Sequence, residues 1–207
     1  MVNKKIFLWY RVLLVSSGGA GCTYLNEQIH KHIQHINPIS NLDHLKHLYS
    51  PDSHLMHYNE FENIIFVYND PLSAILSHFR RGWAIMMHKQ ICHRNDHIDL
   101  KHLKSQDAYF DYVRQTKQDK FGIISHAQRW LEYPNCLFVD FRDIKDTEKK
   151  ISQKLNIPLK LEKKTRHSHS AIKHIPQDII DIYREFDEQF KNKYINSNIQ
   201  KVSSYDV

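Results

Sequence analysis

Small residues are concentrated at positions 16–24, where their types could bind an anion. Three of the five glycines in the chain, Gly18, Gly19 and Gly21, lie in this stretch together with two serines and a threonine. Glycine permits a positive φ and a close approach of the backbone to an anion, and the hydroxyls add hydrogen-bond donors. This composition predicts a cradle for a phosphate. A tight turn without a ligand is the alternative interpretation.

The predicted cradle lies between a buried strand and a helix. Branched and leucine residues at 11–15 predict the strand, and apolar residues then recur at helical spacing, namely Leu25, Ile29, Ile33 and Ile36. The start of such a helix offers unpaired N–H groups and the positive end of its dipole to a bound anion.

A second strand and helix are predicted directly downstream. Residues 63–68 form a continuous apolar run, short enough for a buried parallel strand. Asp70 and Pro71 follow, and these types favour the cap and the first position of a helix.

The remaining sequence continues this alternation after a polar, histidine-rich stretch at 88–120. That stretch predicts a variable, irregular insertion with a short helix near Tyr109. We expect this insertion on the side of the molecule where a substrate that accepts a group would bind. The later elements are a helix at 123–131, a strand at 136–141, a helix at 144–155 and an amphipathic helix at 175–194. Alternating strands and helices predict an α/β fold, a three-layer α/β/α arrangement with a central parallel sheet. We expect one domain over residues 1–195 and a flexible tail at 196–207.

Composition limits the partners and the compartment. The chain has 207 residues and a formal net charge of +6, which favours an anionic partner. The basic residues are dispersed among acidic ones, which argues against nucleic acid. Three cysteines without CxxC spacing predict neither a disulfide framework nor a zinc site, and histidine pairs such as His93 and His97 lack acidic or cysteine companions.

The N-terminus imitates a signal peptide, because an apolar stretch precedes the glycines. Arg11 interrupts that stretch, and cleavage would remove the strand that leads into the turn. No other stretch is long and apolar enough to span a bilayer. We therefore expect a soluble, cytoplasmic protein without a transmembrane segment.

The turn resembles the nucleotide-binding loop of one enzyme family. Residues 21–25 read Gly-Cys-Thr-Tyr-Leu, which is similar to the Gly-Thr-Thr-Trp-Leu of sulfotransferases that use 3'-phosphoadenosine 5'-phosphosulfate, PAPS. The resemblance implies a P-loop type of nucleotide-binding fold in which this loop holds the 5' phosphosulfate. The residues that would do so are Ser17, Gly18, Gly19, Ala20, Gly21, Cys22, Thr23 and Tyr24.

Two further motifs occur in the family's order. Residues 67–71, Val-Tyr-Asn-Asp-Pro, with Ser77 resemble the strand that ends in Arg-Asp-Pro and the serine that bind the 3' phosphate. Asn69 replaces the arginine, and Arg80 and Arg81, about one helical turn beyond Ser77, offer a compensating charge. A solvated helix end is the alternative interpretation of these two arginines. Residues 137–144 resemble the family's third strand.

A basic segment downstream is similar to the loop that closes over the 3' phosphate in this family. The resemblance assigns Lys164 and Arg166 to that role. A solvated basic run is the alternative interpretation of the same residues.

The resemblance also places a base and a cation before the second strand. The family's Lys-x-His corresponds here to Lys46 and His47, which we assign as charge donor and general base. Other histidines and acids nearby remain alternatives for the base: His44, His54, His57, Glu60 and Glu62. Gly18, Gly19 and Ala20 stand where most members have a loop lysine. Either Lys46, Arg80 or another cation stabilises the leaving group, or the protein binds the nucleotide without turnover.

These features predict an enzyme that transfers a sulfuryl group from PAPS to a hydroxyl or amine, with 3',5'-bisphosphoadenosine, PAP, as product and no metal. The acceptor would be a small molecule or a glycan. Two alternatives remain. One is a nucleotide or nucleoside kinase, which should have a Gly-Lys-Ser/Thr loop that this chain lacks. The other is a degenerate nucleotide-binding protein without turnover.

Overall fold

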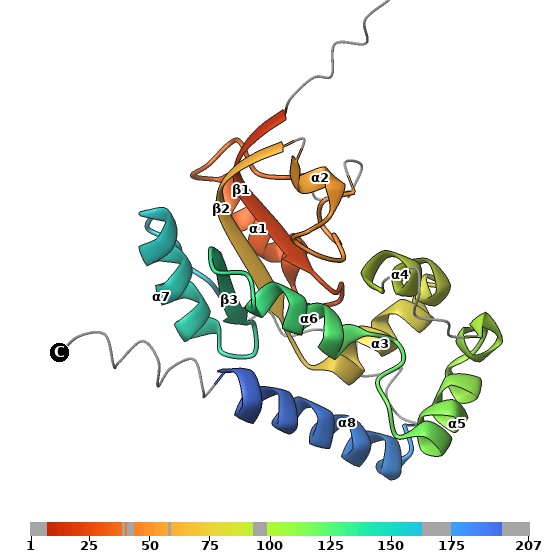
Figure 1. Ribbon diagram of the computed structural model, residues 1–207. Coiled ribbons are helices and arrows are strands. Elements are labelled where there is room, and N and C mark those ends of the chain that lie inside the picture. Colours follow the sequence, from red (N-terminus) through yellow and green to blue (C-terminus); the bar gives the residue numbers. More distant parts are fainter. Residues whose placement is uncertain are drawn as a thin grey trace, which may run out of the picture.

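Three parallel strands form the centre of the molecule in the order β1-β2-β3 (Figure 1). They are β1 (Leu8–Ser16), β2 (Asn59–Tyr68) and β3 (Cys136–Asp140). The register pairs Ser16 with Val67 and Val67 with Val139, so the carboxyl ends of the strands meet at one edge. The structure is a computed structural model that describes residues 8–38, 40, 44–57, 59–92, 99–162 and 175–195.

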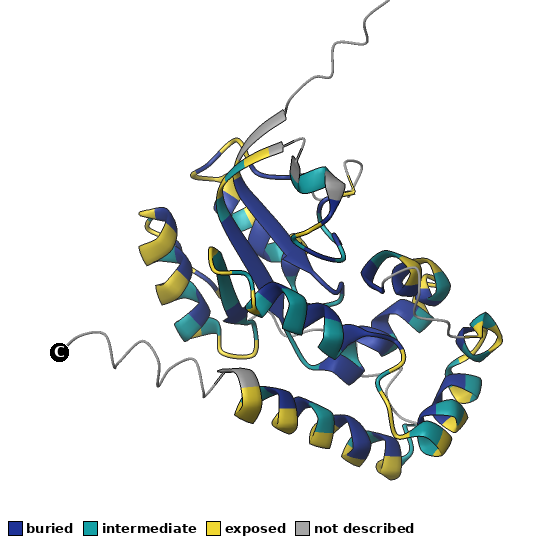
Figure 2. Ribbon diagram, viewed as in Figure 1, coloured by how far each residue is buried: buried dark blue, intermediate teal, exposed yellow. Residues whose placement is uncertain are grey.

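Helices cover both faces of this sheet, because successive strand side chains point to opposite sides. Val12 and Leu14 pack on one face with α1 (Cys22–His30) and α7 (Ile144–Leu155). Leu13 and Val15 pack on the other face with α6 (Ile123–Leu131) and a segment that includes α2 (His54–His57). The second halves of β1 and β2 are accordingly buried without interruption, whereas in β3 only Val139 is fully buried (Figure 2). The predicted α/β class with a parallel sheet is confirmed.

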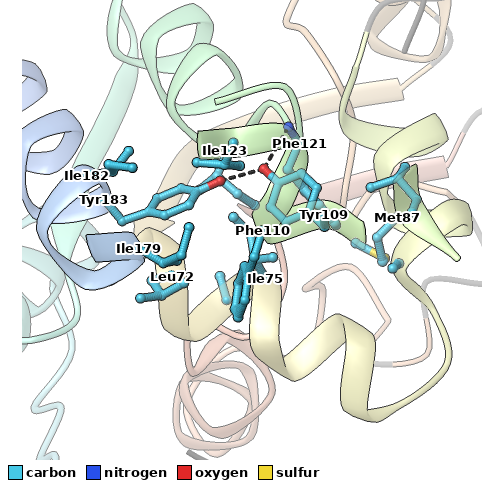
Figure 3. Close-up of a cluster of buried hydrophobic side chains, with 14 of the residues drawn as sticks. Leu72, Ile75, Met87, Tyr109, Phe110, Phe121, Ile123, Ile179, Ile182 and Tyr183 are labelled. Atoms are coloured by element: carbon cyan, nitrogen blue, oxygen red, sulfur yellow. Dashed lines mark hydrogen bonds between the residues drawn. The ribbon is translucent and has the colours of Figure 1, made fainter. Parts of the chain in front are cut away.

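A third apolar cluster lies beyond the sheet and is built mainly from four helices. These are α3 (Pro71–Arg80), α4 (Ala84–Ile91), α5 (Gln106–Thr116) and α8 (Gln177–Phe190). Figure 3 shows Tyr109 of α5 and Tyr183 of α8 with their hydroxyls hydrogen-bonded, and the Tyr109 hydroxyl also accepts the N–H of Phe121 at 3.2 Å. The phenols thus satisfy their polar groups inside an apolar cluster.

The described part of residues 88–120 has the predicted short helix near Tyr109, but it is more regular than predicted. It contains the end of α4, a 3₁₀ turn η1 (Leu100–Leu103) and α5. The inner face of α5 carries Tyr109, Phe110 and Val113, which are at most 1% exposed. In the sequence, Tyr109, Tyr112 and Val113 indicate this helix, and the polar residues on its outer face hide its full length.

The first helix is shorter than its apolar spacing predicts. α1 ends at His30, whereas Ile33 and Ile36 are buried in the segment that returns to the sheet. Ile36 forms an isolated parallel bridge with Val12, and the Asn37 side chain pairs with the N–H and carbonyl of Leu14 at 2.6 and 3.1 Å. These contacts replace further helical turns.

The other predicted elements are present with small shifts of their ends. α3 begins at Pro71, and Asp70 accepts the N–H of Ser73 at 2.6 Å as its cap. α8 is followed by a π-helical turn, η3 (Lys191–Ile195). The predicted tail at 196–207 lies outside the described residues. None of the described helices combines the length and apolarity needed to cross a membrane.

Candidate functional site

A pocket of about 320 Å³ opens where β1 ends and α1 begins. The glycine turn forms one side, and residues from the segment after α1, from α3 and from the start of α4 complete it. Its lining consists of Ser16, Gly18, Gly19, Gly21, Cys22, Thr23, Tyr24, Glu27, Lys46, His47, His78, Arg81, Trp83, Met87 and Phe141.

The glycines of the turn serve both conformation and close packing. Gly19 and Gly21 have φ angles of 66° and 83°, in the left-handed region. A Cβ on Gly19 would lie 2.9 Å from the Cα of Ala74, and one on Gly21 would lie 2.3 Å from the Phe141 ring. The sequence spacing of these glycines is therefore required by the fold itself, whatever the pocket binds.

The start of α1 is open toward the pocket. Gly21 occupies the N-cap position and provides no side-chain cap, and Cys22 and Thr23, the first two helical residues, line the pocket. The first N–H groups of a helix have no intrahelical partners and carry the positive end of its dipole. This end of the pocket favours an anion.

Lys46 supplies a cation at the same point. Its Nζ donates a hydrogen bond to the Thr23 Oγ1 at 3.0 Å, and its carbonyl accepts the N–H of Ser16 at 3.0 Å. Burial lowers the pKa of Lys46, and the charge of Arg81 lowers it further. An ammonium group without strong solvation at a helix N-terminus is a suitable donor for a phosphate or sulfate oxygen.

His47 is held in one tautomer by the end of β1. Its Nδ1 donates to the Ser16 carbonyl at 2.7 Å, which leaves the lone pair on Nε2. Burial lowers the pKa of His47 to about 4, and the charges of Lys46 and Arg81 act in the same direction. The imidazole is therefore neutral at pH 7 and able to accept a proton.

Two more histidines hold the adjacent residue of the turn. His78 Nε2 donates to the Ser17 carbonyl at 2.9 Å. His126 Nε2 donates to the Leu48 carbonyl at 2.7 Å, so its Nδ1 accepts the Ser17 hydroxyl at 2.9 Å. Burial lowers the pKa of His78 to about 4 and that of His126 to about 3. Three neutral imidazoles from separate parts of the chain thus fix the end of β1.

Arg81 contributes a second cation to the pocket. Its guanidinium carbon lies 5.4 Å from the centroid of the Trp83 ring, a cation–π arrangement. Arg81 lines the same pocket as Lys46 and His47, and its charge lowers the pKa values of both. Tyr24 and Phe141 add an aromatic wall, with ring centroids 6.2 Å apart in an edge-on arrangement.

The thiol at the start of α1 is not a nucleophile. Burial raises the pKa of Cys22 to about 11, although Lys46 acts in the opposite direction. A cysteine reacts through its thiolate, so this side chain is chemically inert at neutral pH.

No protein-family model, curated protein or solved structure matches this chain.

Most residues that the sequence assigns to the site line this pocket. They are Gly18, Gly19, Gly21, Cys22, Thr23, Tyr24, Lys46, His47 and Arg81. Ser17 and Ala20 are buried behind it, at 4% and 3% exposure. Lys164 and Arg166 lie outside the described residues.

The two residues assigned to a 3' phosphate, Asn69 and Ser77, do not line the pocket. The Asn69 Oδ1 accepts the N–H of Asp70 at 2.8 Å, so this side chain serves the turn before α3. Ser77 is 8% exposed, and its Cβ lies 3.3 Å from the point where a Cβ on Gly19 would stand. The turn and α3 pack closely here.

Sequence reasoning missed several pocket residues, notably His78 and Trp83. Each stands next to or near an assigned residue, Ser77 or Arg81, but a histidine in a chain with 16 carries little information by itself. Among the described residues, no group of three or more histidine, cysteine or acidic side chains is arranged to hold a metal ion.

Proposed function

We propose that the protein transfers a sulfuryl group from PAPS to a hydroxyl or amine of an acceptor. One observation carries the proposal: Lys46, His47 and Arg81 meet at the open start of α1 in a single pocket. An anion cradle, two cations and one neutral base are the groups that sulfuryl transfer requires, by analogy with phosphoryl transfer.

In this proposal each side chain has a defined task. The Nε2 of His47 accepts the proton of the acceptor hydroxyl as its oxygen forms a bond to sulfur. The bond between sulfur and the bridging oxygen of the donor breaks in line, and its electron pair stays on the 5' phosphate. Lys46 and the N–H groups of α1 bind that phosphate and stabilise its new charge.

The cradle fits the phosphosulfate end of the donor better than its 3' phosphate. The uncapped α1 terminus and the Lys46 ammonium meet at Thr23, a donor set for a tetrahedral anion. Asn69 and Ser77 are engaged in packing, so Arg81 is the described residue of α3 and its end best suited to a second anionic group.

Turnover tests the proposal directly. Purified protein is incubated with sulfur-labelled PAPS and a panel of sugars, phenols and peptides, and labelled product is separated and counted. We expect His47→Ala to reduce turnover about a hundredfold. His30→Ala is the matched control, because His30 is exposed at the end of α1 and lies outside the pocket.

Two outcomes would redirect the assignment. Binding of 3',5'-bisphosphoadenosine without any labelled product favours a nucleotide-binding protein without turnover. Equal turnover in wild type and His47→Ala removes His47 from the chemistry and leaves the base to another group.

A further inference from the structure

Two large apolar side chains are exposed where α3 passes into α4. Trp83 is 46% and Met86 47% exposed, the only large hydrophobic residues so exposed among those described. Trp83 lines the pocket, whereas Met86 does not. A single exposed methionine is common on a protein surface and needs no explanation. An exposed indole at the mouth of an anion pocket does need one, because it lies where it can act on a ligand.

The partner of Trp83 in the free protein is Arg81. Arg81 is the C-cap residue of α3, Gly82 turns the chain with a φ of 68°, and Trp83 follows as the residue before α4. The guanidinium rests on the indole ring at 5.4 Å. Within the described part of the chain, Arg81 makes no ion pair with a carboxylate.

This pairing keeps the guanidinium available for an anion. A carboxylate partner would neutralise Arg81 and compete with an anionic ligand, whereas an aromatic face orients the cation without cancelling its charge. An unrestrained arginine would lose several rotatable bonds on binding, and ordering it in advance reduces that cost.

We propose that Trp83 is a positioning residue, which holds Arg81 at the pocket mouth so that its guanidinium can turn from the indole to a bound anion. The inference rests on the proposed function only in requiring that the pocket binds an anion. It assigns Trp83 a role in affinity that acts through Arg81 and not through the fold.

A double-mutant cycle tests this role with inorganic pyrophosphate as the probe, titrated by calorimetry into the full chain. Trp83→Ala should weaken binding about fivefold, and Arg81→Ala about tenfold. Adding Trp83→Ala to Arg81→Ala should weaken binding by less than about twofold, because the residue through which Trp83 acts is already gone.

Two further variants separate positioning from general damage. Trp83→Phe keeps an aromatic face and should retain affinity within about twofold of wild type. Met86→Ala removes an equally exposed apolar side chain three residues away and should leave pyrophosphate binding unchanged. Melting temperatures of all variants report whether any of them loses the fold.

The indole also reports the movement of Arg81. Pyrophosphate should change the tryptophan emission of wild type, because a cation leaves the exposed ring, and this change should be absent in Trp83→Phe. Equal losses of affinity on Trp83→Ala in the wild-type and Arg81→Ala backgrounds would overturn the proposal, as would wild-type affinity in Trp83→Ala.

The outcomes also distinguish this inference from the proposed function. If the cycle behaves as expected but 3',5'-bisphosphoadenosine does not bind, the positioning role stands and PAPS is the wrong donor. If wild type fails to bind pyrophosphate even at about 10 mM, both the anion pocket and the role of Trp83 are wrong.

Discussion

Gly21 combines a left-handed backbone with direct contact to an aromatic ring, and the two constraints can be separated. Gly82 has a similar φ, 68° against 83°, but a Cβ there would meet no atom within 4 Å. Gly82→Ala should therefore cost only the backbone strain, about 1–2 kcal/mol. Gly21→Ala adds a collision with Phe141 and should destabilise the protein clearly more.

Urea denaturation of the two glycine variants gives the comparison. Equal free energies of unfolding for Gly21→Ala and Gly82→Ala would show that Phe141 does not constrain the turn. Because Phe141 also lines the pocket, Gly21→Ala should weaken pyrophosphate binding, whereas Gly82→Ala should leave Phe141 undisturbed.

His47 gives a prediction about the pH dependence of turnover. Its pKa is lowered from 6.5 to about 4, so the base is already unprotonated across the neutral range. Protonation of His47 in the free enzyme should reduce kcat/KM only as the pH approaches 4. A pH–rate profile with an acid limb near 6.5 would contradict this placement of the base, provided the protein remains folded.

At the scale of elements, three histidines connect the end of β1 to its surroundings and make the fold sensitive to acid. The pKa values of His47, His78 and His126 lie below the ordinary value of 6.5, at about 4, 4 and 3. The unfolded chain therefore binds more protons below pH 6.5. The free energy of unfolding should fall as the pH decreases from 6.5 to about 4, and for His126 to about 3, and be unaffected by these groups above pH 6.5.

A histidine that is protonated in the unfolded chain and neutral in the folded chain adds about 1.4 kcal/mol per pH unit to the slope of the free energy of unfolding against pH. Urea denaturation at several pH values measures the summed slope. His126→Gln should reduce that slope by the contribution of one histidine. His102→Gln is the control, because His102 is partly exposed on η1, stacks on Tyr112 and lies away from the end of β1. An unchanged slope in His126→Gln would show that His126 does not contribute.

The elements also show where sequence periodicity is sufficient and where it fails. Buried strands and the Asp70–Pro71 start of α3 were predictable, because local composition determines them. The end of α1 was not predictable from the sequence. Ile33 and Ile36 have the apolar spacing of a helix, but they are buried outside α1, where Ile36 pairs with Val12 of β1.

For the whole molecule, a partly buried ion cluster joins the carboxyl edge of the sheet to α8. Asp187 accepts the hydroxyl of Tyr68 at 2.8 Å and is paired with Arg142, which also binds Asp140. Asp187→Ala leaves Arg142 with one partner fewer and the Tyr68 hydroxyl unpaired in a buried position. Because Arg142 keeps its pair with Asp140, the unpaired Tyr68 hydroxyl dominates, and we expect a loss of about 1–3 kcal/mol in the free energy of unfolding.

An exposed pair on the same helix provides the control. Asp181 and Arg184 are both more than half exposed, so Asp181→Ala should change stability little. Similar unfolding curves for Asp187→Ala and Asp181→Ala would mean that the cluster does not tie α8 to the sheet.

The composition of the pocket was predictable to a greater extent than its shape. The order of motifs along the chain assigned Lys46, His47 and Arg81, and the fold brings all three to the glycine turn. The order of motifs could not reveal that Lys46 hydrogen-bonds to Thr23, 23 positions earlier in the chain. It also could not reveal that the Asn69 side chain accepts the N–H of the next residue, Asp70. Such contacts depend on side-chain direction, which spacing does not determine.

The most direct measurement is calorimetric titration of wild type and Lys46→Ala with 3',5'-bisphosphoadenosine and, separately, with ATP. We predict that wild type binds the bisphosphate more tightly than ATP. Lys46→Ala should lower the affinity for the bisphosphate by about tenfold or more. Tighter binding of ATP, no binding of the bisphosphate, or an undiminished affinity in Lys46→Ala would contradict the account.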